Sequence, residues 1–257
     1  MRKLLNIVPL LLLIGFLASC KKENKLIAEV DEVNTSSQAF VKINYASAYA
    51  ANSSVQLKVN NTRVSYLLTA RTPFPGGGYN TGGASQDDYL ALTPGTVPFS
   101  ISIPNKNTNN DSVVLFNSNI TLAAGKHYSV HIADTAAKTK MIVLEDDISK
   151  ADTGQSKYRF VNLIPNVTAI DLYYGTTLVA GNIPYLGNSN YFTMPRPATS
   201  LAWSIREAGT GPTGTVLATY TSASSTLSER SYTAFAMGYK GSTDAARKPY
   251  ISFYLNY

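Results

Sequence analysis

Hydrophobic and polar residues alternate in short runs along most of the chain after residue 39, and Gly, Pro, Asn and Ser separate these runs. Clear examples lie at residues 55–60, 99–104 and 251–257. A period of two places successive side chains on opposite faces of a β-strand, whereas an amphipathic helix repeats about every 3.6 residues. The pattern therefore predicts an all-β fold. Periodicity alone leaves open whether the strands form a sandwich or a closed barrel.

The series of strand-like segments occurs twice. The segment FVKI at residues 40–43 corresponds to FVNL at 160–163, and FSISI at 99–103 corresponds to LAWSI at 201–205. Each copy holds about seven candidate strands in about 100 residues, which is typical of an immunoglobulin-like sandwich. We therefore predict tandem immunoglobulin-like β-sandwich domains, produced by duplication.

Changes in composition place the boundaries of these segments. The first copy contains a loop at residues 69–88 that is rich in Gly and Pro, and we do not expect regular strands there. The expected segments are a signal peptide at 1–19, a polar tether at 20–38 that begins with a lipidated cysteine, a first sandwich at 39–149, a linker at 150–156 and a second sandwich at 157–257.

The first residues have the three parts of a secretory signal. Arg2 and Lys3 provide positive charge, residues 4–17 are mostly apolar, and Leu-Ala-Ser precedes Cys20. This ending resembles the lipobox of bacterial lipoproteins, which implies lipidation of Cys20 and a membrane anchor. Lys21 resembles the residue that follows the cysteine in outer-membrane lipoproteins. An ordinary signal peptide with a chance cysteine is the alternative.

Composition narrows the classes of partner. After removal of the signal peptide, 20 basic and 16 acidic residues remain, a net charge of +4. The basic residues are dispersed, and together with the export signal this argues against a nucleic-acid partner. Cys20 is the only cysteine, so no disulfide can stabilise the fold and hydrophobic cores must do so.

The second copy resembles a known family of domains. The segments YRFVNLIPN at 158–166, AIDLYYG at 169–175 and YTA at 232–234 resemble the domain-of-unknown-function family 4397 (DUF4397). The resemblance is clear in the second half and looser in the first, where Gln56 stands in place of Asp171. It implies an extracytoplasmic sandwich and brings no established activity.

Few residues suggest catalytic or metal chemistry. His127 and His131 are the only histidines, and on one strand they would lie roughly 13 Å apart, too far to share a metal ion without a bulge. We expect both to face solvent. The acidic groups at residues 87–88 and 145–147 lack the spacing of a calcium loop and are expected in solvated turns or at strand ends. No Gly-x-Ser-x-Gly motif occurs. Together, these observations lead us to predict no catalytic residue, no metal site and no cofactor.

Tyrosine is unusually frequent, with 17 residues. Tyr79 and Tyr89, on or beside the glycine-rich loop, are the candidates for exposed rings that contact a ligand. The alternative is that the tyrosines fill half-buried strand positions.

These features favour a membrane-anchored lipoprotein of the cell envelope that acts as a non-catalytic binding or structural module. Its ligand would be a glycan or an envelope protein. The alternative is an envelope hydrolase or metal-dependent enzyme whose site cannot be recognised from sequence. The sequence leaves open the oligomeric state and whether the chain faces the periplasm or the medium.

Overall fold

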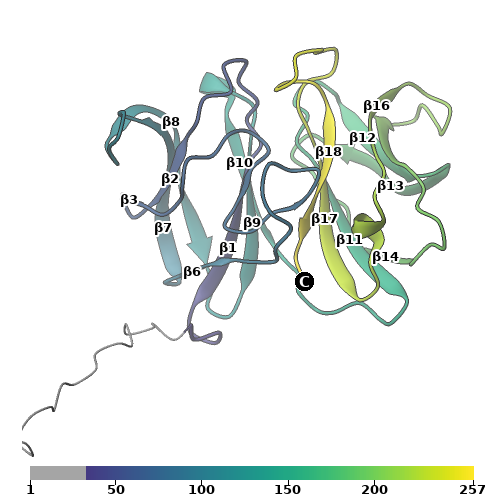
Figure 1. The fold of residues 1–257 in the computed structure, drawn as a ribbon, viewed down its shortest axis with the longest axis horizontal. Coiled ribbons are helices and arrows are strands. Elements are labelled where there is room, and N and C mark those ends of the chain that lie inside the picture. Colours follow the sequence, from purple (N-terminus) through teal and green to yellow (C-terminus); the bar gives the residue numbers. More distant parts are fainter. Residues whose placement is uncertain (1–32) are drawn as a thin grey trace, which may run out of the picture. The chain divides into compact units, whose positions relative to one another are not determined.

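Strands make up nearly all regular structure in residues 33–257, the part of the chain that the computed structural model describes (Figure 1). The signal peptide, Cys20 and the tether up to residue 32 lie outside the described residues. From Asn34 onward the chain forms one unit. Two short 3₁₀ helices, η1 (Ala136–Lys138) and η2 (Ala223–Thr226), are the helical elements described. No helix in residues 33–257 is long and apolar enough to span a bilayer.

The described strands divide between a first half, residues 39–145, and a second half, residues 155–257. Those of the first half are β1 (Ala39–Tyr45), β2 (Gln56–Val59), β3 (Thr62–Arg63), β4 (Pro73–Phe74), β5 (Gly78–Tyr79), β6 (Leu90–Leu92), β7 (Gly95–Pro104), β8 (Asp111–Leu122), β9 (His127–Ala133) and β10 (Lys140–Glu145). Those of the second half are β11 (Gln155–Asn162), β12 (Ala169–Tyr174), β13 (Thr177–Pro184), β14 (Phe192–Pro195), β15 (Trp203–Glu207), β16 (Val216–Tyr220), β17 (Arg230–Met237) and β18 (Tyr250–Leu255).

Each half contains two sheets (Figure 1). In the first half, outer sheet 1 has the order β3-β2-β7-β8, and inner sheet 1 has the order β10-β9-β1-β4 with β6 also paired to β1. In the second half, inner sheet 2 has the order β14-β11-β17-β18-β5 and outer sheet 2 has the order β13-β12-β15-β16. Both inner sheets contain a parallel pair, β1 with β9 and β11 with β17. The two halves thus share much of their pairing scheme.

Alternation along the strands explains why each half is a sandwich. On β1, the side chains of Ala39, Val41, Ile43 and Tyr45 pack into one buried cluster with Leu57 and others from outer sheet 1. An equivalent cluster lies between inner sheet 2 and outer sheet 2, and its large aromatic rings include Trp203, Tyr158, Tyr232, Phe160 and Phe253. Burial of these apolar side chains between two sheets is the main stabilising term. The predicted all-β sandwich is therefore confirmed. The strands of each half form two separate sheets and not a closed barrel.

The loop at residues 69–88 differs from its expected irregular course. It contains two short strands, and β5 pairs with β18 of the second half rather than with its own half. A Cβ at Gly78 would lie 1.6 Å from the carbonyl oxygen of Phe253, so only glycine permits this approach. The expectation of no regular strand in this loop was wrong for β4 and β5, and the Gly and Pro content did not indicate that the loop would cross to the other half.

We expect Phe160→Ala to lower the free energy of unfolding by about 3–5 kcal/mol, because Phe160 is fully buried and its removal leaves a cavity. Val216→Ala is the control, since Val216 is 40% exposed, and it should change stability by less than about 0.5 kcal/mol. Urea denaturation followed by the fluorescence of Trp203 measures both values. Equal effects of the two substitutions would contradict the described core.

Candidate functional site

Inner sheets 1 and 2 contact each other through faces that point away from the two sandwich cores. We call the side chains between them the inter-sheet layer. Its apolar part is a cluster of buried residues from both halves: Ala46, Ala133, Val161, Leu163, Phe235, Met237 and Tyr254. Its polar part is also buried and includes Lys42, Asn44, Ser129, His131, Asp146, Arg159 and Thr233. Buried charges require partners, so their contacts decide whether this layer holds together.

A buried ion pair joins the two halves. The guanidinium of Arg159 on β11 donates from Nη2 to Oδ1 of Asp146, which follows β10. The side chains of Arg159 and Asp146 are only 4% and 0% exposed. Oδ2 of Asp146 accepts from Ser129 Oγ at 2.7 Å and from Tyr89 Oη at 3.0 Å. Nη1 of Arg159 donates to the Glu145 carbonyl at 2.8 Å. These additional hydrogen bonds help to offset the cost of removing both charges from water.

Lys42 on β1 is a second buried cation. Its Nζ donates to the carbonyl oxygen of Leu255 on β18 at 2.5 Å and lies 4.5 Å from the ring centroid of Tyr89. Burial lowers the pKa of Lys42 to about 8, and attraction to Asp146 only partly opposes that shift. The lysine thus ties a strand of the first half to the backbone of the second.

His131 corrects the expectation that both histidines face solvent. It is completely buried, its Nδ1 lies 3.0 Å from Nδ2 of Asn44, and its ring stacks on Tyr254 with centroids 5.6 Å apart. Burial, assisted by the nearby charge of Arg159, lowers the pKa of His131 to about 3, so the ring is neutral near pH 7. His127 is only partly buried and stacks on Phe40 with centroids 4.5 Å apart. The covering surface comes from the other half, which local alternation cannot reveal.

Tyr79 and Tyr89 were expected to have exposed rings, but both side chains are half-buried. The ring of Tyr89 lies edge-on to His127 with centroids 4.9 Å apart, and its hydroxyl binds Asp146. Burial raises the pKa of Tyr89 well above its ordinary value. Tyr79, on β5, packs against the core of the second half. Tyr79 therefore helps to join the halves, and Tyr89 supports the carboxylate of the ion pair between them. Their role as ligand contacts stays a prediction.

A cleft of about 610 Å³ opens at one edge of the inter-sheet layer. The residues that line it include Lys126, His127, Glu145, Asp147, Ser149 and Tyr191. Lys126 pairs with Glu145 at 2.7 Å, and Lys157 pairs with Asp147 at 2.8 Å. The acidic segment at 145–147 was expected in a solvated turn or at a strand end. It lies at the end of β10, and Asp146 within it is buried. Residues 33–257 contain no cluster of three side chains suited to hold a metal ion. The charges in this cleft are mostly used within the protein.

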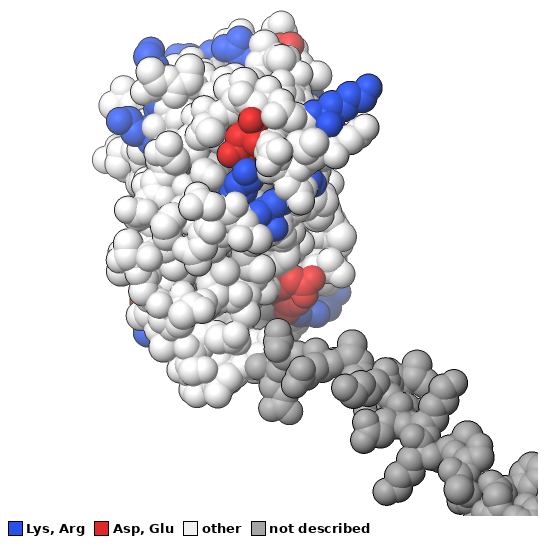
Figure 2. All heavy atoms as spheres, turned by 90° about the vertical axis from the view of Figure 1, so that its left-hand side faces the viewer, with Lys and Arg blue, Asp and Glu red and all other residues white. Residues whose placement is uncertain are grey.

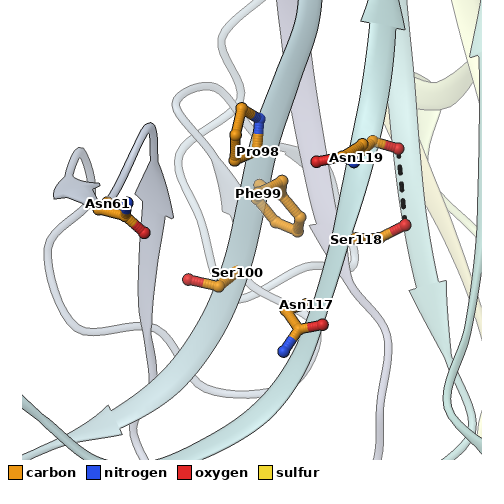
Figure 3. A pocket seen from close by; sticks show the side chains of 7 residues that line it. All are labelled: Asn61, Pro98, Phe99, Ser100, Asn117, Ser118 and Asn119. Carbon is orange, nitrogen blue, oxygen red and sulfur yellow. Dashed lines mark hydrogen bonds between the residues drawn. The ribbon is translucent and has the colours of Figure 1, made fainter.

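A second hollow, which we call the outer-sheet groove, lies on outer sheet 1 and has a volume of about 360 Å³ (Figure 3). Its lining residues are Asn61, Pro98, Phe99, Ser100, Asn117, Ser118 and Asn119. Ser100 on β7 lies opposite Asn117 on β8, and Pro98 lies opposite Asn119. These four residues share the outward face of the sheet, because the intervening Phe99 packs into the sandwich core.

The polar side chains of the outer-sheet groove are free within the described structure. In residues 33–257, the side chains of Asn61, Ser100, Asn117 and Asn119 form no hydrogen bond with the protein, and Ser118 Oγ makes a long 3.5 Å contact with the backbone oxygen of Asn119. The nearby ammonium of Lys58 is held by Asp111 at 2.8 Å. Figure 2 shows the outward side of the first half, where most of the surface belongs to uncharged residues. The groove therefore presents hydrogen-bonding groups without a free charge.

Sequence reasoning did not identify this groove. The polar residues at alternate positions of residues 117–121 were a signal for an exposed strand face. Their proximity to Asn61 depends on the pairing of β2 with β7 and of β7 with β8. Such pairing between distant segments cannot be read from the period of a single strand.

Comparison with known families gives a match over the first half and the start of the second. The model of the family described as a domain of unknown function (DUF4397) matches residues 39–173, more than half of the chain. The chain belongs to the DUF4397 family. The match confirms the expected resemblance to the family. It includes the whole first half, where the resemblance was expected to be looser, and ends at residue 173, early in the second half, where the resemblance was expected to be clear. It also reaches β11 and most of β12 of the second half. A search of curated proteins found no match for this DUF4397 chain.

We expect Arg159→Met to lower the free energy of unfolding by about 3–5 kcal/mol, because it leaves the buried carboxylate of Asp146 without its cation. The double variant Arg159→Met/Asp146→Asn should recover part of this loss, since the amide oxygen still accepts a hydrogen bond. Lys126→Met is the control and should leave stability unchanged, because its pair with Glu145 is solvent-exposed. Urea denaturation compares the variants. An unchanged Arg159→Met variant would show that the pair does not hold the halves together.

Acid should destabilise the protein through His131. Its pKa is about 3 in the folded chain and 6.5 without burial, so between these values the unfolded state binds more protons. Stability contributed by the neutral ring is present above pH 6.5 and is lost as the pH falls toward 3. His131→Phe keeps an aromatic ring and should move the midpoint of acid unfolding to lower pH. His127→Phe should move it less, because His127 is less buried. Circular dichroism against pH measures the midpoints, and identical midpoints in wild type and His131→Phe would refute this explanation.

Proposed function

We propose that this DUF4397 chain is a non-catalytic binding or structural module of the cell envelope, anchored to the outer membrane by a lipid on Cys20. The proposal treats the halves as duplicated immunoglobulin-like domains. Their common pairing scheme, with β1 parallel to β9 and β11 parallel to β17, supports duplication.

One contrast between two surfaces carries the proposal. Charged groups between the halves are bound within the protein, as in the pairs of Arg159 with Asp146 and Lys157 with Asp147. Those groups serve the joint between the halves. The carboxamides of the outer-sheet groove, in contrast, face outward without partners in the described structure. Unpartnered groups on a sheet held in place by a sandwich core are suited to bind a ligand without chemical change.

The proposed location of the protein in the cell rests on its sequence. The apolar segment that ends in Leu-Ala-Ser-Cys supports export and lipidation at Cys20, and Lys21 supports the outer membrane as the destination. A tether at residues 20–38 would carry the folded part away from the bilayer. The ligand would then be another component of the envelope or of its surroundings, either a glycan or a protein.

We expect Cys20→Ser to move the protein from the membrane fraction to the soluble fraction, because the substitution removes the lipidated thiol. The released Cys20→Ser protein should still sediment with isolated cell envelopes in a saturable manner, because binding resides in the folded part. Heat-denatured Cys20→Ser protein is the control for nonspecific sedimentation. Absence of saturable binding, or cleavage of an envelope polymer by the protein, would contradict a non-catalytic binding module.

A further inference from the structure

The outer-sheet groove is specific in what it offers a ligand. Carboxamides and hydroxyls each provide both donors and acceptors. Asn61, Ser100, Asn117 and Asn119 line the groove from β7, β8 and the turn that joins β2 to β3 (Figure 3). Sugar hydroxyls have the same dual character. A row of such groups on a sheet therefore matches a polyhydroxylated ligand better than a ligand that only donates or only accepts.

Charge around the groove excludes ionic recognition. The groove itself is lined by no acidic or basic side chain. Lys58 lies opposite Ser100 in the sheet, but its ammonium is bound to Asp111, whose carboxylate also accepts from Gln56 Nε2 at 2.9 Å and from Ser102. An anionic ligand would lose part of its hydration without gaining a free cation. A neutral ligand avoids this cost.

The volume and lining of the groove favour a small ligand over a protein partner. The volume of about 360 Å³ lies within the range of ligand pockets, roughly 300–1,000 Å³. Protein interfaces usually centre on exposed aromatic or apolar anchors. Here the one aromatic ring, Phe99, is 2% exposed and belongs to the sandwich core. Pro98 offers the groove an exposed apolar ring against which a sugar face can pack.

We infer that the outer-sheet groove is a binding site for neutral carbohydrate, with Asn61, Asn117 and Asn119 as its hydrogen-bonding residues. The inference rests on the proposed function, for which it supplies the class of ligand. The carboxamides bind sugar hydroxyls, and Pro98 contacts the apolar face of a sugar ring.

The test measures binding of defined sugars to the full-length protein, purified in a detergent that has no sugar headgroup. A glycan array with neutral, uronic-acid, sulfated and amino-sugar oligosaccharides identifies the class, and calorimetric titration with the best-bound oligosaccharide gives the affinity. We expect neutral sugars to bind. Asn117→Ala/Asn119→Ala should weaken their binding about tenfold or more, because several hydrogen bonds are lost.

Matched controls separate the groove from the fold. Thr96→Ala/Thr121→Ala alters an exposed cross-strand pair on β7 and β8 outside the groove, and it should change affinity by less than about twofold. Should the double asparagine variant fail to fold, Asn61→Gly replaces it, because Asn61 has φ of 61°, a conformation that glycine adopts readily. Asn61→Gly should weaken sugar binding while the protein stays folded.

Three results would overturn the inference: preference for charged sugars, unchanged affinity in the asparagine variants, or no carbohydrate bound at all. If no sugar binds but the Cys20→Ser protein still sediments with envelopes, the proposed function stands and the ligand is of another class. If sedimentation also fails, the proposed function fails as well.

Discussion

The ion pair between Arg159 and Asp146 is the interaction on which the arrangement of the two halves depends. Removal of two charges from water costs several kcal/mol per ion, and an ion pair offsets this cost only with good geometry and further hydrogen bonds. Ser129, Tyr89 and the Glu145 carbonyl supply those bonds from the first half. The charge of Arg159 therefore stays buried only while both halves are in contact, which makes the pair a condition for the joint.

This joint determines which parts of the surface remain for function. It occupies one face of each inner sheet, and the second face of each inner sheet lies in a sandwich core. Lys42 and His131 are buried in the same layer, although lysine and histidine side chains often take part in catalysis. The outward faces of the outer sheets remain accessible, and the outer-sheet groove lies on one of them.

The local pattern of hydrophobic and polar residues predicted the strands well. It did not predict that the strands of the inner sheets are buried on both faces. Alternation at residues 55–60 and 99–104 predicted β2 and β7, because one face of these strands is apolar and buried. Lys42, Asn44 and His131 occupy alternate positions that a single strand pattern assigns to solvent. They are buried because a sheet from a distant segment covers them, and strand period contains no information on such long-range packing. The outer-sheet groove was missed for the same reason, since its residues meet only through pairing between strands.

We conclude that the inter-sheet layer makes residues 34–257 one cooperative unit. Differential scanning calorimetry of the wild-type protein near pH 7 tests it most directly. We expect a single unfolding transition whose calorimetric and van't Hoff enthalpies agree, because neither half can unfold without exposing the buried charges of the other. Two separate transitions, one for each half, would show that the inter-sheet layer does not couple the halves and would contradict a single cooperative unit.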